Sequence, residues 1–435
     1  MPLNFSIIES FIAEHEADMK NKAMIRQDRY RILSELGTAL QTVLKDYEVF
    51  ETELNALVME IINNTTSYET LMECHERAVA GVENFFLEED TIVDVHDLFR
   101  LIRDRIAVRV LELVEREMVD EGLGKPPADY VWAGLGSEGR DEQTMVTDQD
   151  NLLVYAEGDD DFASVELRRR CAEISASDGP SILPDDLDPR MLVDGYFQIF
   201  AQKASDRLHQ VGFEKCKGGV MPVNARWRGS IKDWKKRIDE RITFGRGILE
   251  PLDIIILTDA RLVNGSKAIL TELMDYFFSM LINNKHIMKE FIQSAVLMPS
   301  ALTFFGGFKV EKEGENKDKF NIKVLGWSPL ILSVRMLSLS NGIFETNTLK
   351  RIGILRQRNI IRKEMELSLT DAYFTFVRYR IINQINYRDE SGRSSNFLRP
   401  DMLGPDEQER LRRAMKAVET FQKFIQETLL FGEAV

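Results

Sequence analysis

The sequence contains little cysteine. Three cysteines, Cys74, Cys171 and Cys216, are spread over 435 residues. An odd number of widely separated cysteines excludes a disulfide framework and offers no zinc-knuckle spacing, and free thiols favour a reducing cytoplasm. The five histidines are equally scattered, so we assign none of them to catalysis or to a metal ion.

Long apolar runs are also absent. No stretch of about 18 apolar residues occurs, which excludes a transmembrane helix. The first residues, MPLNFSIIESFIAEHEADMK, mix apolar and acidic side chains. They lack the basic segment followed by an apolar segment that marks a secretory signal. We therefore expect a cytoplasmic protein without a membrane partner.

Positive charge is in deficit. The chain has 56 lysines and arginines against 71 aspartates and glutamates, a formal net charge of -15. So acidic a surface repels nucleic acid, and we expect no nucleic-acid partner, although a nucleotide can still bind through a metal ion. The hydrophobic content of 44% is typical of a globular protein.

The pattern of the chain divides it into three parts. Residues 1–125 carry apolar side chains at helical spacing and predict an N-terminal helical region. Glycines and prolines at 122–127 mark a boundary. Residues 126–267 predict a domain with a small mixed sheet, and residues 268–435 predict a helical C-terminal domain with one β-hairpin. The expected fold class is α+β, with the small sheet between two helical regions.

Local patterns place the elements of the sheet domain. Short buried strands are expected at 130–135 and 151–155, with one helix from 137 to about 144 between them. The apolar run LDIIILTDARLVNG (252–265) predicts a further strand. The segment 304–327 has the composition of a hairpin with a charged tip.

The stretch GLGSEGR, which follows the first predicted strand, has the features of a phosphate site. Gly136 and Ser137 would present backbone N–H groups and a hydroxyl where a helix begins, and glycine lets the backbone approach a ligand closely. Arg140, three residues later, can add a cation. Lys217, in the glycine-rich turn 216–224, either contacts phosphate as well or belongs to a plain turn.

Two aspartates precede the second predicted strand. Asp148 and Asp150 are two residues apart, so on a strand they point to one face. Two adjacent carboxylates repel each other unless a cation lies between them, and Mg²⁺ suits such oxygen ligands. The alternative is a turn in which an aspartate caps the backbone. A metal pair beside a phosphate seat is what a nucleoside triphosphate requires.

Asp259 is the candidate for a third carboxylate. It follows the apolar residues of LDIIILTDAR, and a carboxylate at the end of so apolar a run needs a reason to be there. We predict that it completes a two-metal Mg²⁺ site with Asp148 and Asp150, deprotonates an acceptor hydroxyl, or does both.

These motifs resemble a known superfamily. Gly136-Ser137, ten intervening residues and Asp148-Gln149-Asp150 resemble the nucleotidyltransferase signature of the DNA polymerase β superfamily. The longer stretch GSEGRDEQTMVTDQDN is similar to the signal-transduction nucleotidyltransferases that are often attached to CBS or cyclic-nucleotide-binding domains. That family is related to the PII-protein uridylyltransferases and the glutamine-synthetase adenylyltransferases. Further segments resemble it in the same order: CKGGVMPVNARWRGSIKDW (216–234), LTDARLVNG (257–265), NTLKRIGILR (347–356) and NFLRPDMLGPDEQERLRRAMKAVETFQ (396–422).

The resemblance implies an activity and roles for these residues. Gly136 and Ser137 would hold the triphosphate, and Asp148 and Asp150 would bind metal. The enzyme would move a nucleoside monophosphate from a nucleoside triphosphate, ATP among the candidates, to an acceptor hydroxyl and release pyrophosphate. By analogy with the relatives, the acceptor would be a protein in a signalling pathway. The superfamily prefers apolar residues around its second aspartate, where this chain has Gln149 and Asn151, a departure that the narrower family tolerates.

Two alternatives remain open at this point. The chain could transfer a nucleotide to a small molecule, or it could bind a nucleotide without turnover and act as a regulatory sensor. The sequence leaves open the base of the nucleotide, the acceptor and the oligomeric state, a homodimer included.

Overall fold

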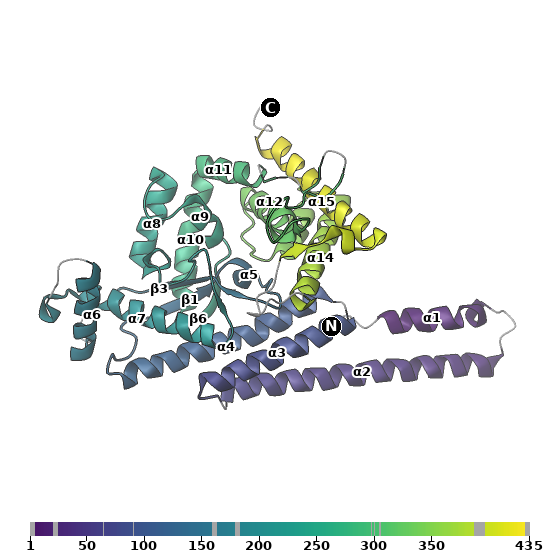
Figure 1. Cartoon of the computed structure of the whole chain (residues 1–435), viewed down its shortest axis with the longest axis horizontal. Coiled ribbons are helices and arrows are strands. Elements are labelled where there is room, and N and C mark those ends of the chain that lie inside the picture. Colours follow the sequence, from purple (N-terminus) through teal and green to yellow (C-terminus); the bar gives the residue numbers. More distant parts are fainter. Residues whose placement is uncertain are drawn as a thin grey trace. The chain divides into compact units, whose positions relative to one another are not determined.

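The computed structural model shows a mostly helical α+β chain with two units, Met1–Ile106 and Ala107–Val435 (Figure 1). No described helix is long and apolar enough to cross a membrane. The division into 1–125, 126–267 and 268–435 stays a prediction. The structure describes residues 5–20, 25–63, 65–89, 91–158, 163–178, 183–296, 298–299, 301–303, 306–386 and 396–430.

The N-terminal part is helical, as the apolar spacing predicts. A buried arginine illustrates how its helices pack: Arg103 donates a hydrogen bond from Nε to Nε2 of His75 at 3.2 Å, and its guanidinium lies 4.0 Å from the centre of the Phe99 ring. His75 thus has a structural partner. The helices are α1 (Phe5–Lys20), α2 (Arg26–Asn63), α3 (Tyr68–Glu89) and α4 (Ile92–Asp120), of which α4 continues into the second unit.

Four strands form the central sheet of the second unit. In spatial order they are β5 (Arg228–Ser230), β3 (Asn151–Tyr155), β1 (Tyr130–Gly134) and β6 (Arg261–Gly265). β1 is antiparallel to both of its neighbours, and β3 is parallel to β5, so the sheet is mixed, as predicted. Every residue of β1 and β3 is buried, which fits the centre of a sheet with helices on both faces.

Aromatic side chains attach one face of the sheet to a helix. Tyr130 and Trp132 are two residues apart on β1 and therefore share a face. Their rings lie 5.3 Å and 6.3 Å, centre to centre, from Phe200 of α7 (Pro189–Gln210). Figure 1 shows α8 (Ile231–Phe244) and α10 (Lys267–Asn283) on the opposite side of the sheet from α7.

Shorter elements and the C-terminal helices complete the second unit. The single-turn helix α5 follows β1, and β2 pairs in parallel with β4. Their bounds, with the others, are α5 (Gly136–Gly139), β2 (Asp148–Gln149), α6 (Val165–Asp178), β4 (Glu214–Lys215), α9 (Pro251–Leu257), α11 (Lys285–Val296), β7 (Phe320–Asn321), the helical turn η3 (Lys323–Trp327), α12 (Ser328–Ser340), α13 (Thr348–Gln357), α14 (Lys363–Asn386), β8 (Phe397–Leu398) and α15 (Pro405–Ile425).

The apolar run 252–265 is not one strand. Its first half forms helix α9, and only Arg261–Gly265 is a strand, β6. Pro251 occupies the first turn of α9, where its fixed φ favours a helix, and the Asp253 carboxylate accepts a hydrogen bond from the backbone N–H of Glu250 at 2.8 Å. A buried helix and a buried strand are equally apolar, so composition alone did not separate them.

Two further local predictions are wrong. The segment 304–327 is not a hairpin: β7 pairs with the distant β8, residues 323–327 are helical, and the rest forms isolated bridges at most. Residues 304 and 305 lie outside the described residues. The helix predicted from 137 to about 144 ends at Gly139, and Asp141 then takes a positive φ of 56°, which no helix accommodates.

The short helix α5 depends on a glycine that contacts backbone. A Cβ on Gly139 would lie 2.0 Å from the carbonyl oxygen of Asp259 and 2.7 Å from that of Gly134. Backbone atoms cannot rotate away as a side chain can, so the turn after β1 and the turn after α9 touch only because residue 139 lacks a side chain.

We predict that Gly139→Ala lowers the free energy of unfolding by about 1–3 kcal/mol through overpacking. Denaturant unfolding followed by tryptophan fluorescence measures this. The matched control is Gly353→Ala in α13, where an added Cβ meets nothing within 4 Å and the gain in helix propensity should stabilise by about 0.5–1 kcal/mol. Equal effects of the two substitutions would contradict the close contact at Gly139.

Candidate active site

The turn after β1 brings Gly136 against Asp150. Gly136 has a φ of +55°, and a Cβ at this position would lie 2.6 Å from Oδ2 of Asp150. The backbone N–H of Leu135 donates to the carbonyl oxygen of Asp150 at 2.7 Å, which fixes the two segments to each other. Ser137, half-buried, is the next residue in this turn. The Gly-Ser turn and the second aspartate, 14 positions apart, therefore meet.

The two aspartates differ in their surroundings. Asp148 is exposed on β2, and Asp150 follows between β2 and β3. Burial raises the pKa of the Asp150 carboxyl and the charge of Asp148 adds to the rise, whereas a hydrogen bond from the Cys216 thiol and the charges of Lys323 and Arg140 oppose it. Asp150 is thus a carboxylate that lacks enough nearby positive charge.

Polar side chains on both sides hold the aspartate segment in place. The amide of Gln149 donates to the carbonyl oxygens of Ser205 and Phe213, each at 3.0 Å, and accepts from the Ser205 hydroxyl at 2.8 Å. The amide of Asn151 donates to Oε2 of Glu138 at 3.0 Å. Gln149 and Asn151 are the residues that depart from the superfamily's apolar preference, and their buried hydrogen bonds explain how the fold accommodates them.

Asp259 has surroundings quite unlike those of the aspartate pair. It lies in the turn after α9, fully buried, and its Oδ2 accepts from Nη1 of Arg140 at 2.7 Å and from Nη2 of Arg335. Nη2 of Arg351 is 3.5 Å from its Oδ1. Among the described residues, no three histidine, cysteine, aspartate or glutamate side chains are grouped to hold a metal ion. The expected meeting of Asp259 with Asp148 and Asp150 is therefore not observed.

Arg140 belongs to this buried ionic cluster and not to an open phosphate seat. Its Nε donates to Oε2 of Glu142 at 2.8 Å. Burial disfavours the charged form of Arg140, but Glu142 and Asp259 outweigh burial and raise its pKa. Glu142 in turn accepts from the backbone N–H of Thr348 at 2.7 Å, and the Asn347 amide donates to the carbonyl oxygen of Arg140 at 3.0 Å. The cluster thereby connects the turn after α5 to the start of α13.

Lys217 lies exposed on the turn after β4. Its neighbour Cys216 donates the hydrogen bond to Asp150, so the turn passes close to the aspartate pair. No sequence signal marked Cys216 as a neighbour of the aspartate pair, because it reaches Asp150 through a contact that only the folded chain makes.

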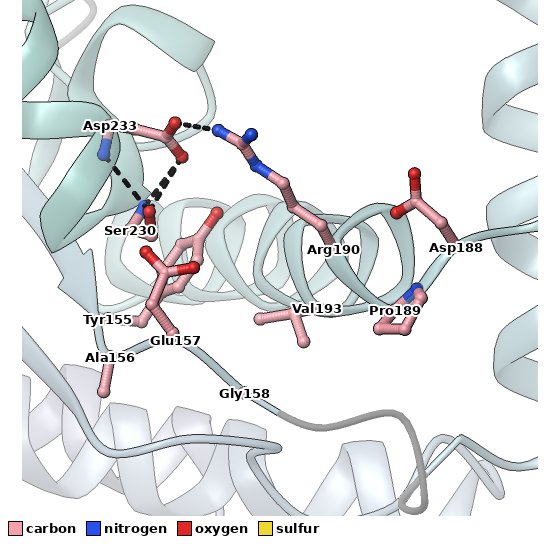
Figure 2. Close-up of a pocket in the computed structure, with 10 residues that line it drawn as sticks. All are labelled: Tyr155, Ala156, Glu157, Gly158, Asp188, Pro189, Arg190, Val193, Ser230 and Asp233. Atoms are coloured by element: carbon pink, nitrogen blue, oxygen red, sulfur yellow. Dashed lines mark hydrogen bonds and ion pairs between the residues drawn. The ribbon is translucent and has the colours of Figure 1, made fainter.

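A separate cavity of about 290 Å³ lies at the far end of β3. Figure 2 shows the Arg190 side chain reaching Asp233, which also receives hydrogen bonds from Ser230 at the start of α8. The lining begins at Tyr155, the last residue of β3, whereas the aspartate pair precedes its first residue. None of the predicted site residues lines this cavity, so it is not the candidate active site.

Two family models match the chain, and the first of them contains the Gly-Ser turn and the aspartate pair. The model described as "Putative nucleotidyltransferase DUF294" matches residues 76–177 and 181–246, and the model described as "Putative nucleotidyltransferase substrate binding domain" matches residues 285–429. No curated protein matches the chain. The first match contains the Gly-Ser turn and the aspartate pair, Asp259 lies between the matches, and together they extend over most of the chain beyond residue 76. The chain therefore belongs to the family described as "Putative nucleotidyltransferase DUF294".

Proposed function

We propose that the chain is a Mg²⁺-dependent enzyme that transfers a nucleoside monophosphate from a nucleoside triphosphate to an acceptor hydroxyl and releases pyrophosphate. One observation carries this proposal: the Gly136-Ser137 turn lies directly against Asp150, with Asp148 beside it, in a chain that belongs to a nucleotidyltransferase family. Because Gly136 has no side chain, a polyphosphate can approach the backbone closely there. The two carboxylates can bind the metal ion that accompanies the polyphosphate.

The residues present fit a divalent cation at the aspartate pair. Asp148 and Asp150 offer the carboxylate oxygens that Mg²⁺ prefers. The raised pKa of Asp150 means that its charged form is disfavoured, and a bound cation would stabilise that charged form. When bound, the metal would neutralise phosphate charge and activate the attacking oxygen. Asp148 and Asp150 would hold it, and Gly136 and Ser137 would offer backbone N–H groups and a hydroxyl to the phosphates.

In this proposal Asp259 and Arg140 act as a buried ion pair instead of a third ligand and a phosphate contact. Three arginines already occupy the Asp259 carboxylate, and Arg140 is 6% exposed, which leaves it little access to a ligand. Lys217 is exposed and keeps its proposed role near phosphate.

The acceptor in this proposal is a protein hydroxyl. Support comes from the resemblance to protein-modifying uridylyltransferases and adenylyltransferases, and from the separate substrate-binding match over 285–429. Incubation of the chain with Mg²⁺, cell lysate and labelled ATP, UTP, CTP or GTP tests this choice. Label on a protein band supports a protein acceptor. Label on a small molecule shows that the acceptor is a small molecule instead. Tight nucleotide binding without pyrophosphate release identifies a regulatory sensor.

We predict that Asp148→Asn and Asp150→Asn each reduce the rate of pyrophosphate release about 100-fold or more, because each removes a negatively charged ligand of the metal ion. The measurement is the initial rate with Mg²⁺ and a turnover-competent nucleotide. The control is Asp406→Asn, which removes an exposed carboxylate from the first turn of α15 and should leave the rate unchanged. Full activity in either site variant would refute the assignment of the aspartate pair.

We further predict that Asp150→Asn stabilises the metal-free protein at pH 7. The folded state raises the pKa of Asp150, so at pH values above that raised pKa the charged carboxylate costs stability, and below the unfolded pKa this cost vanishes. The variant should therefore melt at a higher temperature than the wild type at pH 7 in EDTA, with a smaller gap at acidic pH. Mg²⁺ should raise the melting temperature of the wild type only. An equal rise in both proteins would contradict metal binding at Asp150.

A further inference from the structure

A cavity of about 480 Å³ lies where α11 packs against α10 and α12 (Figure 1). Three segments form its wall: the corner between α10 and α11, helix α11 itself, and the turn that ends α12. Six of its lining side chains are large and apolar: Leu281, Ile282, Met288, Ile292, Leu339 and Phe344. A cavity of this volume and composition is typical of a site that binds a small organic molecule.

The wall after α12 is held in place by packing and hydrogen bonds. The Phe344 ring stacks on Phe278 of α10, with 4.2 Å between the ring centres. Gly342 takes a φ of +62°, and the backbone N–H of Ile343 donates to the carbonyl oxygen of Ser338 at 2.9 Å. Ile343 is buried, whereas 37% of Phe344 stays exposed at the cavity. The cavity is therefore formed before any ligand binds, which lowers the cost of binding.

The backbone carbonyl groups near the cavity already have donors. The carbonyl oxygens of residues 336–339 in the last turn of α12 each accept a hydrogen bond, two from backbone N–H groups and two from the side chains of Ser340 and Asn341. At the end of α10, the carbonyl oxygen of Leu281 accepts from the N–H of Asn284 at 3.2 Å. These bonds satisfy the groups that a helix end otherwise leaves open, so side chains determine which polar group a ligand can present.

The polar side chains that remain are basic. Lys289 and His286 of α11 line the cavity, and both are exposed. Within the described part of the chain, neither has an ion pair or a hydrogen bond. None of the residues that line the cavity is acidic, and Glu290, next to Lys289 in sequence, is paired with Arg241 at 3.4 Å. In a chain with a net charge of -15, this local positive charge favours a negatively charged ligand.

We propose that this cavity binds a small organic anion with an apolar body, such as a medium-chain carboxylate. The apolar body would lie against the buried side chains of Leu281, Ile292 and Leu339, and removal of its surface from water would supply most of the affinity. The carboxylate would lie at Lys289, with His286 beside it. None of the residues assigned to the nucleotide lines this cavity, so the anion would be a second ligand, and its binding does not depend on the proposed function.

Isothermal titration calorimetry of the whole chain tests this proposal with decanoate and decylammonium, which share an apolar body and differ in charge. Decanoate should bind at one site with a Kd of about 0.1–1 mM, as expected for a ligand of this size. Decylammonium should bind about fivefold to 30-fold more weakly, because one exposed attraction is lost and a repulsion replaces it. Absence of decanoate binding up to about 5 mM, or equal affinity for both probes, overturns the proposal.

Two substitutions at exposed positions locate the site. Lys289→Gln should weaken decanoate about threefold to fivefold and leave decylammonium no weaker, whereas Lys267→Gln, at the exposed start of α10, should change neither affinity. Ser340→Trp should fill part of the cavity and weaken decanoate about tenfold or more. Its matched control is Ser368→Trp on α14, because both serines are exposed and donate from Oγ to the carbonyl four residues earlier, at 2.8 Å and 2.7 Å.

Each variant can overturn a different part of the proposal. Unchanged decanoate affinity in Lys289→Gln would show that the lysine does not bind the carboxylate. Unchanged affinity in Ser340→Trp, or an equal loss in Ser368→Trp, would show that decanoate binds elsewhere. If a nucleotide with Mg²⁺ competes with decanoate for the wild type, the anion is not a second ligand. A melting temperature for each variant confirms that it is folded, and the other variant decides if one is not.

Discussion

The contact between Asp259 and three arginines is the interaction on which the arrangement of the second unit depends. Arg140 comes from the turn after α5, Arg335 from α12 and Arg351 from α13. One carboxylate thereby joins the sheet domain to the C-terminal helices. Removal of one member of a buried ionic cluster leaves the others charged and unpaired in the interior, which costs far more than the loss of an exposed pair.

The position of the aspartate pair follows from this contact through a short chain of neighbours. The carbonyl oxygen of Asp259 lies against Gly139, close enough to exclude a Cβ. Gly139 closes the turn that begins at Gly136, and Gly136 lies against Asp150. The ionic cluster and the candidate metal site are therefore two ends of one packed turn, so the geometry at Asp150 is sensitive to a carboxylate that does not itself face the ligand.

The sequence predicted those parts of the site that local patterns determine. The strands at 130–134 and 151–155 and the mixed sheet were predictable from short apolar runs, and the spacing of Ser137 and Asp148 indicated the family. The assignment of Asp259 rested on a strand that is in fact helix α9 followed by a turn. The side chain that follows a helix points in a different direction from one that follows a strand. The three arginines that neutralise Asp259 come from positions 140, 335 and 351. Such long-range partners leave no periodic trace in sequence.

Unfolding of metal-free Asp259→Asn is the most direct test of this division of roles among the carboxylates. All four tryptophans, Trp132, Trp227, Trp234 and Trp327, lie in the second unit, so denaturant unfolding in EDTA followed by tryptophan fluorescence reports on that unit alone. If Asp259 is the counter-ion of three buried arginines, the substitution should reduce the free energy of unfolding by about 3–5 kcal/mol. A stability equal to or above that of the wild type, as expected for a metal ligand in the absence of metal, would contradict the account.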